Sequence, residues 1–93
     1  MTFILSYTSK VESKIKKRCQ KDLKLREKTA KTINQLALDP RHPGLETHKV
    51  ISKLLKREAL GSWINGEYRL VWLYKENDRI LIIDFGTHNE VYL

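Results

Sequence analysis

Two apolar segments joined by Asn65-Gly66 constrain the fold of this chain most strongly. Asn-Gly between such segments is the strongest short-range signal for a β-hairpin, because a type I′ turn needs a positive φ at both central residues. A two-residue loop would place Ser62 opposite Arg69, and paired residues share a face of the sheet. The segment after the turn, residues 68–74, is apolar on both faces apart from Arg69, which predicts a central strand.

The first half of the chain predicts one strand followed by two helices. Residues 2–7 alternate weakly, as a strand does. The segment from Ser9 to Glu12 matches a capping box and predicts the start of the first helix. Apolar residues at helical spacing mark the inward face of that helix: Val11, Ile15 and Cys19.

A second helix is predicted from Asp22 to Leu38, and it ends before Pro40 because proline cannot continue the hydrogen-bond ladder. Its predicted inward residues are Ala30, Ile33, Leu36 and Ala37. A last strand is predicted over residues 80–85, after a polar turn. The whole order predicts an α+β fold: a four-stranded, mainly antiparallel sheet with the two N-terminal helices packed on one face. The length predicts a single domain over residues 1–93.

The positive charge of the chain is concentrated in the helical segment. Between Lys10 and Lys31 there are ten basic and three acidic residues, and the difference of +7 equals the whole formal net charge. A segregated excess of this size favours a polyanion partner over a merely solvated helix face. Three presumed exposed lysines are predicted to bind nucleic acid, in particular ribosomal RNA: Lys16, Lys17 and Lys21.

Several function classes are disfavoured by composition. No segment approaches the ~20 consecutive apolar residues of a membrane span, and residues 1–7 lack the basic region of a signal peptide. The single cysteine, Cys19, is typical of the reducing cytosol and excludes a cysteine-based zinc site. His42 and His48 are six positions apart and make a poor metal motif. We therefore expect a cytoplasmic protein without a metal or another cofactor.

The last residues carry the most suggestive chemistry. Gly86 follows a strongly apolar run, and His88 and Tyr92 come shortly after it. Histidine exchanges protons near neutral pH, and a phenol can donate a hydrogen bond, stack on a base or pass a proton. Arg69 would bind a phosphate through its planar fork, unless it pairs with a nearby carboxylate such as Asp84. On a basic chain these groups suggest chemistry on a phosphodiester.

Taken together, these features resemble the RelE/ParE toxin superfamily of type II toxin–antitoxin operons. The resemblance covers essentially the whole chain, and its most specific parts are residues 65–72 and 86–92. RelE-type members cut mRNA in the ribosomal A site, whereas ParE-type members poison DNA gyrase and do not cut RNA. The resemblance implies that the partners are a cognate antitoxin and the ribosome with its mRNA.

The resemblance also implies a catalytic set. Arg69 matches the arginine that RelE-type toxins hold beside the scissile phosphate. His88 matches a basic residue that is a histidine in the YafQ-like branch, and Tyr92 matches the C-terminal aromatic residue. Two lysines of RelE match Leu60 and Ser62 and are therefore absent. Nearby basic residues are predicted to supply that charge: Lys53, Lys56 and Arg57.

The resulting hypothesis is a ribosome-dependent, metal-independent endoribonuclease that uses attack by the 2′-hydroxyl. Such a reaction needs a base, an acid and charge stabilisation, and the sequence leaves open which group is the acid and which the base. Two alternatives stay open. One is a ParE-type gyrase inhibitor without RNase activity, and the other is a catalytically inactive homologue that binds nucleic acid or an antitoxin.

Overall fold

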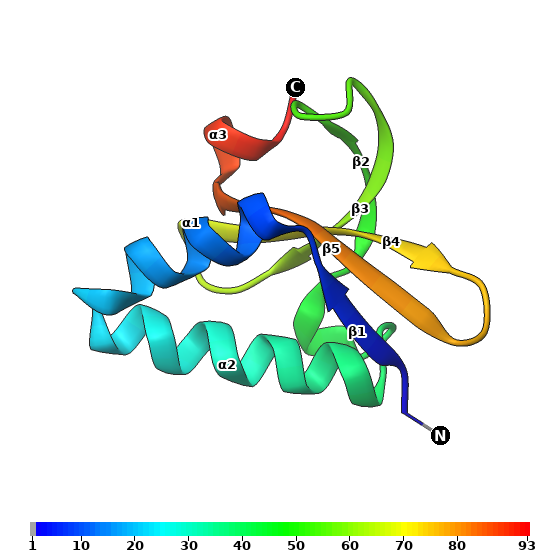
Figure 1. Cartoon of the computed structure of the whole chain (residues 1–93), viewed down its shortest axis with the longest axis horizontal. Coiled ribbons are helices and arrows are strands. Elements are labelled where there is room, and N and C mark those ends of the chain that lie inside the picture. The colour runs from blue at the N-terminus through cyan, green and yellow to red at the C-terminus, as the bar shows by residue number, and fades with distance from the viewer. Residues whose placement is uncertain (1) are drawn as a thin grey trace.

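The computed structural model describes residues 2–93 and contains one mixed sheet, two long helices and a short C-terminal helix (Figure 1). In chain order the elements are β1 (Ile4–Tyr7), α1 (Ser9–Gln20), α2 (Leu23–Leu38), the 3-10 turn η1 (Pro43–Leu45), β2 (His48–Ser52), β3 (Arg57–Trp63), β4 (Tyr68–Lys75), β5 (Arg79–Thr87) and α3 (His88–Val91). The predicted α+β class is confirmed. No helix of the described chain is long and apolar enough to cross a membrane.

The sheet has five strands in the order β1-β5-β4-β3-β2, not the four that the sequence predicted. β1 pairs with β5 in parallel, and the other three pairs are antiparallel. β4 lies in the middle, as its apolar character on both faces predicted. The missed strand is β2, an edge strand whose residues are mostly exposed, so it lacks the apolar alternation that marks a strand in sequence.

The turn at Asn65-Gly66 joins adjacent antiparallel strands as predicted, but it is not a two-residue type I′ turn. Neither residue has a positive φ, and the loop spans residues 64–67. The Asn65 side chain instead closes the turn, because its Oδ1 accepts the backbone N–H groups of Glu67 (2.9 Å) and Tyr68 (2.7 Å).

The longer loop shifts the β3–β4 register by one residue. Trp63 pairs with Arg69, and Ser62 pairs with Leu70. A shift of one residue moves a side chain to the other face of the sheet. The interpretation that Ser62 and Leu60 share a face with Arg69 is therefore wrong. Ser62 is buried and its Oγ accepts the indole N–H of a core tryptophan at 2.8 Å.

The predicted inward face of α1 is confirmed, since Val11 and Cys19 are buried and Ile15 is half-buried. The predicted capping box is wrong: Thr8, not Ser9, caps the helix, and its Oγ1 accepts the N–H of Val11 at 3.2 Å.

The predicted inward face of α2 is confirmed in part, because Leu36 is buried and Ile33 is half-buried against the core. Its buried residues are Leu25, Thr29, Thr32 and Leu36, and the spacing of four, three and four is that of one helix face. Ala30 is exposed, contrary to prediction, because the two threonines occupy the inward positions on either side of it. Thr29 meets α1, where its Oγ1 accepts the Cys19 thiol at 3.8 Å.

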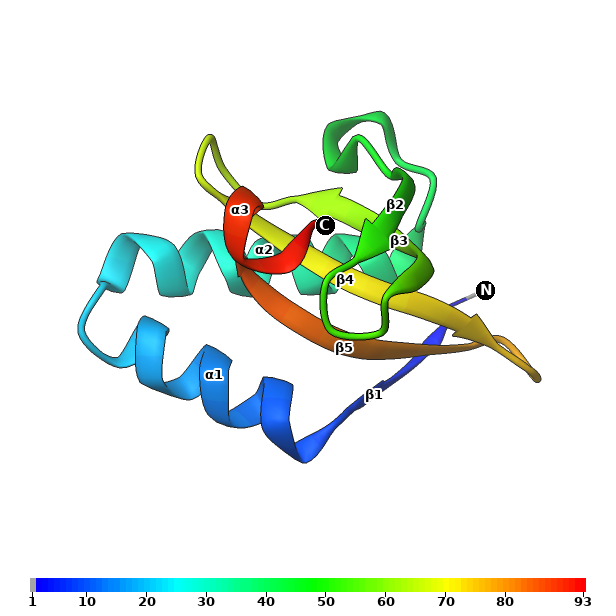
Figure 2. The ribbon, with the colours of Figure 1, turned by 90° about the horizontal axis from the view of Figure 1, so that it is seen from above.

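The two faces of the sheet carry separate apolar cores. One core includes Leu70 and Trp72 and is covered by α1 and α2. The other is smaller and is formed by Ala59, Val71, Ile83, Val91 and Tyr92. Figures 1 and 2 show α3 on the side of the sheet opposite α2.

The C-terminal residues are part of this second core. The backbone N–H of Lys53 bonds to the carbonyl of Val91 at 2.8 Å, and the N–H of Leu93 bonds to the carbonyl of Ile51 at 2.9 Å. The chain end therefore pairs with the β2 end of the sheet. This pairing fixes the position of Tyr92, around which the candidate site is built.

Candidate functional site

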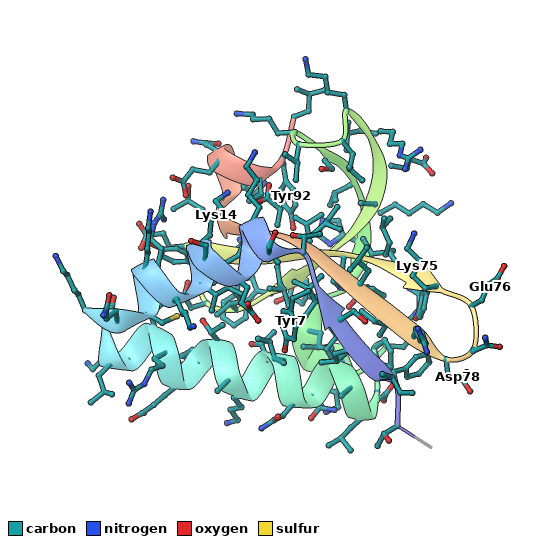
Figure 3. All side chains as sticks on the ribbon, viewed as in Figure 1. Tyr7, Lys14, Lys75, Glu76, Asp78 and Tyr92 are labelled. Carbon is teal, nitrogen blue, oxygen red and sulfur yellow. The ribbon has the colours of Figure 1, made fainter. Side chains whose placement is uncertain are left out.

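Tyr92 lies at the centre of the site. Figure 3 shows its side chain between α3 and the sheet, and only 9% of the residue is exposed. Its hydroxyl rests against Gly61 of β3, where an added Cβ would lie only 2.2 Å from the oxygen. Glycine at this position is what allows the phenol to reach the sheet. The hydroxyl is buried and has no hydrogen-bond partner among residues 2–93.

Two imidazoles flank the Tyr92 ring. The His88 ring meets it edge-on with a centroid distance of 4.7 Å, and the His48 ring is 6.3 Å away in a similar arrangement. His88 is one helical turn before Tyr92, whereas His48 comes from β2 and pairs with Gly61. Both histidines are exposed, so their rings are open to a ligand on this face.

His48 is the residue that sequence reasoning missed. Its only signal was its residue type, because its position depends on an edge strand that the sequence did not reveal. Its Nδ1 lies 2.8 Å from the backbone carbonyl oxygen of Glu46. A carbonyl oxygen can only accept, so Nδ1 carries the proton of the neutral ring. Nε2 then holds a lone pair and can accept a proton.

Arg69 is half-buried in β4 on the Tyr92 face of the sheet. Its Nη1 donates to the carbonyls of Asn65 (2.7 Å) and Tyr68 (3.0 Å), which hold the guanidinium at the end of the strand. Three of its five N–H bonds are left over. Within the described chain no carboxylate lies within 4.0 Å of it.

The carboxylates that could have neutralised Arg69 are engaged elsewhere. Asp84 is buried and pairs with Lys14 at 2.7 Å, and Glu90 pairs with Arg18 at 2.7 Å. Burial raises the pKa of the Tyr92 phenol, and the charge of Arg69 lowers it to a smaller extent. The phenol therefore stays protonated at neutral pH and can act as a donor.

A network of charged groups holds α3 in place. Glu90 accepts the backbone N–H of Thr87 at 2.8 Å and receives two hydrogen bonds from the guanidinium of Arg18. These bonds, those from Arg18 first, lower the pKa of Glu90 to about 2. Lys53 donates to the carbonyl of Asn89 at 2.6 Å from the other side. α3 is thus fixed to α1 and to the β2–β3 turn, which positions His88.

The predicted basic residues fall into two groups. Lys53 reaches the site through α3, and Lys56 and Arg57 are exposed on the same β2–β3 hairpin. The other three are exposed on α1 or directly after its end, and α1 covers the opposite face of the sheet: Lys16, Lys17 and Lys21. The structure brings Arg69, His88 and Tyr92 together with Lys53 but not with the lysines of α1. In the described chain no group of three His, Cys, Asp or Glu side chains is placed to hold a metal.

Solved structures share this architecture, although no protein-family model and no curated protein matches the chain. The YoeB/ParE toxin from Agrobacterium tumefaciens is 17% identical, with a TM-score of 0.74 over 92% of this chain and 99% of that one. YoeB in the YoeB–YefM toxin–antitoxin heterotetramer from Staphylococcus aureus is 19% identical, with a TM-score of 0.71 over 95% and 99%. YafQ from E. coli strain BL21(DE3) is 13% identical, with a TM-score of 0.68 over 95% and 96%.

The chain has the RelE/ParE toxin fold. The resemblance noted in the sequence is thereby confirmed for the fold, and the match extends over nearly the whole length of both partners. Fold does not determine function, so the activity has to be argued from the site.

Proposed function

We propose that this chain is the toxin of a type II toxin–antitoxin system and cuts mRNA on the ribosome. The observation that carries the proposal is a group of side chains on one face of this fold: two imidazoles, a buried phenol, and an arginine that has no carboxylate partner among residues 2–93. These are the groups that cleavage at a 2′-hydroxyl needs, namely a base, an acid and a cation for the developing charge.

In the proposed reaction the 2′-oxygen attacks the adjacent phosphorus and the bond to the 5′-oxygen breaks. His48 accepts the proton of the 2′-hydroxyl at Nε2, because its Nδ1 is committed to the Glu46 carbonyl. His88, in its protonated form, donates a proton to the leaving 5′-oxygen. The three remaining N–H bonds of Arg69 stabilise the phosphorane. The Tyr92 ring lies edge-on to both histidines and holds them on one face, while its buried hydroxyl stays protonated.

The ribosome would supply the positioning. Orienting a bound substrate can lower the activation free energy by ~7 kcal/mol or more. A small site can therefore be effective on ribosome-bound mRNA and weak on free RNA. The reaction would take place in the cytoplasm. S. aureus YoeB and E. coli YafQ form complexes with the antitoxins YefM and DinJ. We propose that this chain likewise has a cognate antitoxin.

The test is mRNA cleavage in a translating extract by the wild type and by Arg69→Ala, His48→Gln and His88→Gln variants. Arg79→Ala is a matched control, because Arg79 is exposed at the start of β5 and far along the strand from the site. We expect each site variant to lose at least tenfold in cleavage rate with an unchanged melting temperature. Wild-type cleavage by Arg69→Ala would overturn the proposed mechanism.

A gyrase inhibitor is the second candidate, and one observation favours it. The three residues of β3 nearest to Arg69 on its face are Ala59, Gly61 and Trp63, which are uncharged, and Arg57 lies on this face only at the far end of the strand. Gyrase supercoiling should therefore be measured in parallel. Inhibited supercoiling without mRNA cleavage would replace the RNase proposal, and the absence of both activities would indicate a binding protein without catalysis.

A further inference from the structure

A cleft of about 290 Å³ lies at the edge of the sheet, between α2, η1 and the end of β3. Its volume is at the lower end of the roughly 300–1,000 Å³ that ligand pockets have, which is enough for a single ring system with its substituents. Its apolar lining residues include Leu45, Trp63 and Ile64, and its polar lining residues include Lys28, Lys31 and His42.

The polar part of the cleft includes two positively charged lysines beside the uncharged Thr32 and Gln35. Lys28 and Lys31 are three residues apart on α2, so their side chains are neighbours on the helix surface. Both are exposed, and no carboxylate of residues 2–93 lies within 4.0 Å of their ammonium groups. An anion entering the cleft would therefore not have to displace an existing ion pair.

His42 adds a third donor. The backbone N–H of Gly44 donates to its Nδ1 at 3.0 Å, so Nδ1 is an acceptor and the proton of the neutral ring sits on Nε2. This is the opposite tautomer to that of His48 in the neighbouring site. His42 is thus set to donate to an oxygen, whereas His48 is set to accept a proton.

Trp63 connects the cleft to the catalytic face. It pairs directly with Arg69 across β3 and β4. β2 leaves it uncovered, because the β2–β3 pairing extends only to Gly61. Trp63 is half-buried and is one of the residues that line the cleft. An aromatic face beside cationic donors is the combination that binds single-stranded nucleic acid, through base stacking and phosphate contacts.

We propose that this cleft binds a nucleotide of the RNA strand that neighbours the cut site. Its base stacks on Trp63, and its phosphate is held by Lys28, Lys31 and the Nε2–H of His42. This inference rests on the proposed function, because the strand that enters the cleft is the one whose phosphodiester lies at Arg69. The cleft accepts one flat ring and one phosphate, which favours a nucleotide over a protein segment.

The test measures binding of a fluorescein-labelled 2′-O-methyl RNA trinucleotide by fluorescence anisotropy. The methyl groups block the attacking oxygen, so the probe is not cleaved. Changing Lys28 and Lys31 together to Gln should weaken binding about tenfold. It should also reduce the slope of log K against log salt by about 0.7, because the two lysines neutralise one phosphate. Lys10→Gln with Lys75→Gln is the control pair, since both lysines are exposed and lie outside the cleft.

The stacking contact is tested at Trp63. Trp63→Leu should weaken binding about tenfold, and Trp63→Phe should restore most of it, because stacking requires an aromatic face. Iodide quenching gives an independent measurement on the unaltered chain. Trp72 is fully buried, so quenching reports on Trp63, and bound RNA should reduce it. Equal affinity of the cleft variant and its control pair, or no protection of Trp63, would overturn the inference.

The two proposals fail in different ways. If the protein cuts mRNA but binds the trinucleotide independently of Lys28 and Lys31, the proposed function is supported and the proposed role of the cleft is wrong. If the protein binds the probe through the cleft but does not cut mRNA, the role of the cleft is supported and the proposed function is wrong. A polyglutamate peptide is included as a competitor. If the peptide binds the cleft more tightly than the RNA does, the occupant is an acidic protein segment and the nucleotide inference is wrong.

Discussion

Replacing Tyr92 by phenylalanine removes one oxygen atom, and the surroundings of that atom predict a more stable protein. The hydroxyl is buried against Gly61 and has no partner in the described chain. A buried polar group without a hydrogen bond destabilises the folded state by about 1–3 kcal/mol. The ring itself would keep its contacts with Ala59, Val71 and Ile83, because those involve carbon atoms.

The expected gain is about 1 kcal/mol, the lower end of that range, because the missing oxygen leaves a small void above Gly61. For a domain of 93 residues this corresponds to an increase in melting temperature of about 4–8 °C. Gly61→Ala should have the opposite effect. Its Cβ would lie 2.2 Å from the Tyr92 oxygen and 2.9 Å from Cζ, and such overpacking costs about 1–3 kcal/mol.

Thermal and urea unfolding of the wild type, both single variants and the double variant form a cycle that isolates the contact. The cost of Gly61→Ala should be smaller when residue 92 is phenylalanine but should not vanish, because Cζ remains close. A melting temperature of Tyr92→Phe several degrees below the wild type would show that the hydroxyl has a partner in the folded protein, and the reasoning would be wrong. Reduced mRNA cleavage by a stabilised Tyr92→Phe would indicate that the hydroxyl is kept for the substrate.

Three further predictions follow from the structure. Truncation after Asn89 should unfold the protein, because Val91 and Tyr92 are buried and each contributes roughly 1.5–3 kcal/mol; a retained cooperative melt by circular dichroism would contradict this. Glu90→Gln should lower stability at pH 7 by only about 0.5–1 kcal/mol, since the ion-pair side chains are 37% and 42% exposed. The pKa of Glu90 is lowered from 4.5 to about 2, so the stability difference between Glu90→Gln and the wild type should be complete above pH 4.5 and vanish as the pH falls to 2. Urea unfolding midpoints that differ equally at pH 7 and at pH 2 would exclude the charge as the cause. Changing three exposed lysines together to Glu should weaken co-sedimentation with ribosomes and make it less dependent on salt, without changing the melting temperature: Lys16, Lys17 and Lys21. Unchanged binding would refute a role for these residues.

The parts of the fold that the sequence predicted are those with strong local signals. β4 is central because it is apolar on both faces, and the inward face of α1 follows from its helical spacing. The Asn65-Gly66 signal located the hairpin but not its geometry. The Asn65 side chain satisfies two backbone N–H groups, which stabilises a longer loop without a positive φ. Propensity alone cannot distinguish that loop from a type I′ turn, and the register shift follows from it.

The candidate site could be predicted only in part for a related reason. Arg69, His88 and Tyr92 lie on elements that the sequence revealed, and the chemistry of the residues made them visible. His48 lies on an edge strand that is held by pairing with β3 and with the chain end. Long-range pairing of this kind is a tertiary effect, and no local pattern encodes it. The same holds for Gly61, which only the approach of Tyr92 explains.

The position of the site has a physical consequence for both stability and activity. The C-terminal segment supplies Val91 to the second core and Tyr92 to both the core and the site. β2 supplies His48 to the site and accepts the chain end through Ile51 and its neighbours. Residues 88–93 are therefore required to bring the two imidazoles to one site, because the rings of His88 and His48 both lie against Tyr92. A chain that lacks this pairing has neither a complete second core nor a complete site, so the same contacts support both stability and activity.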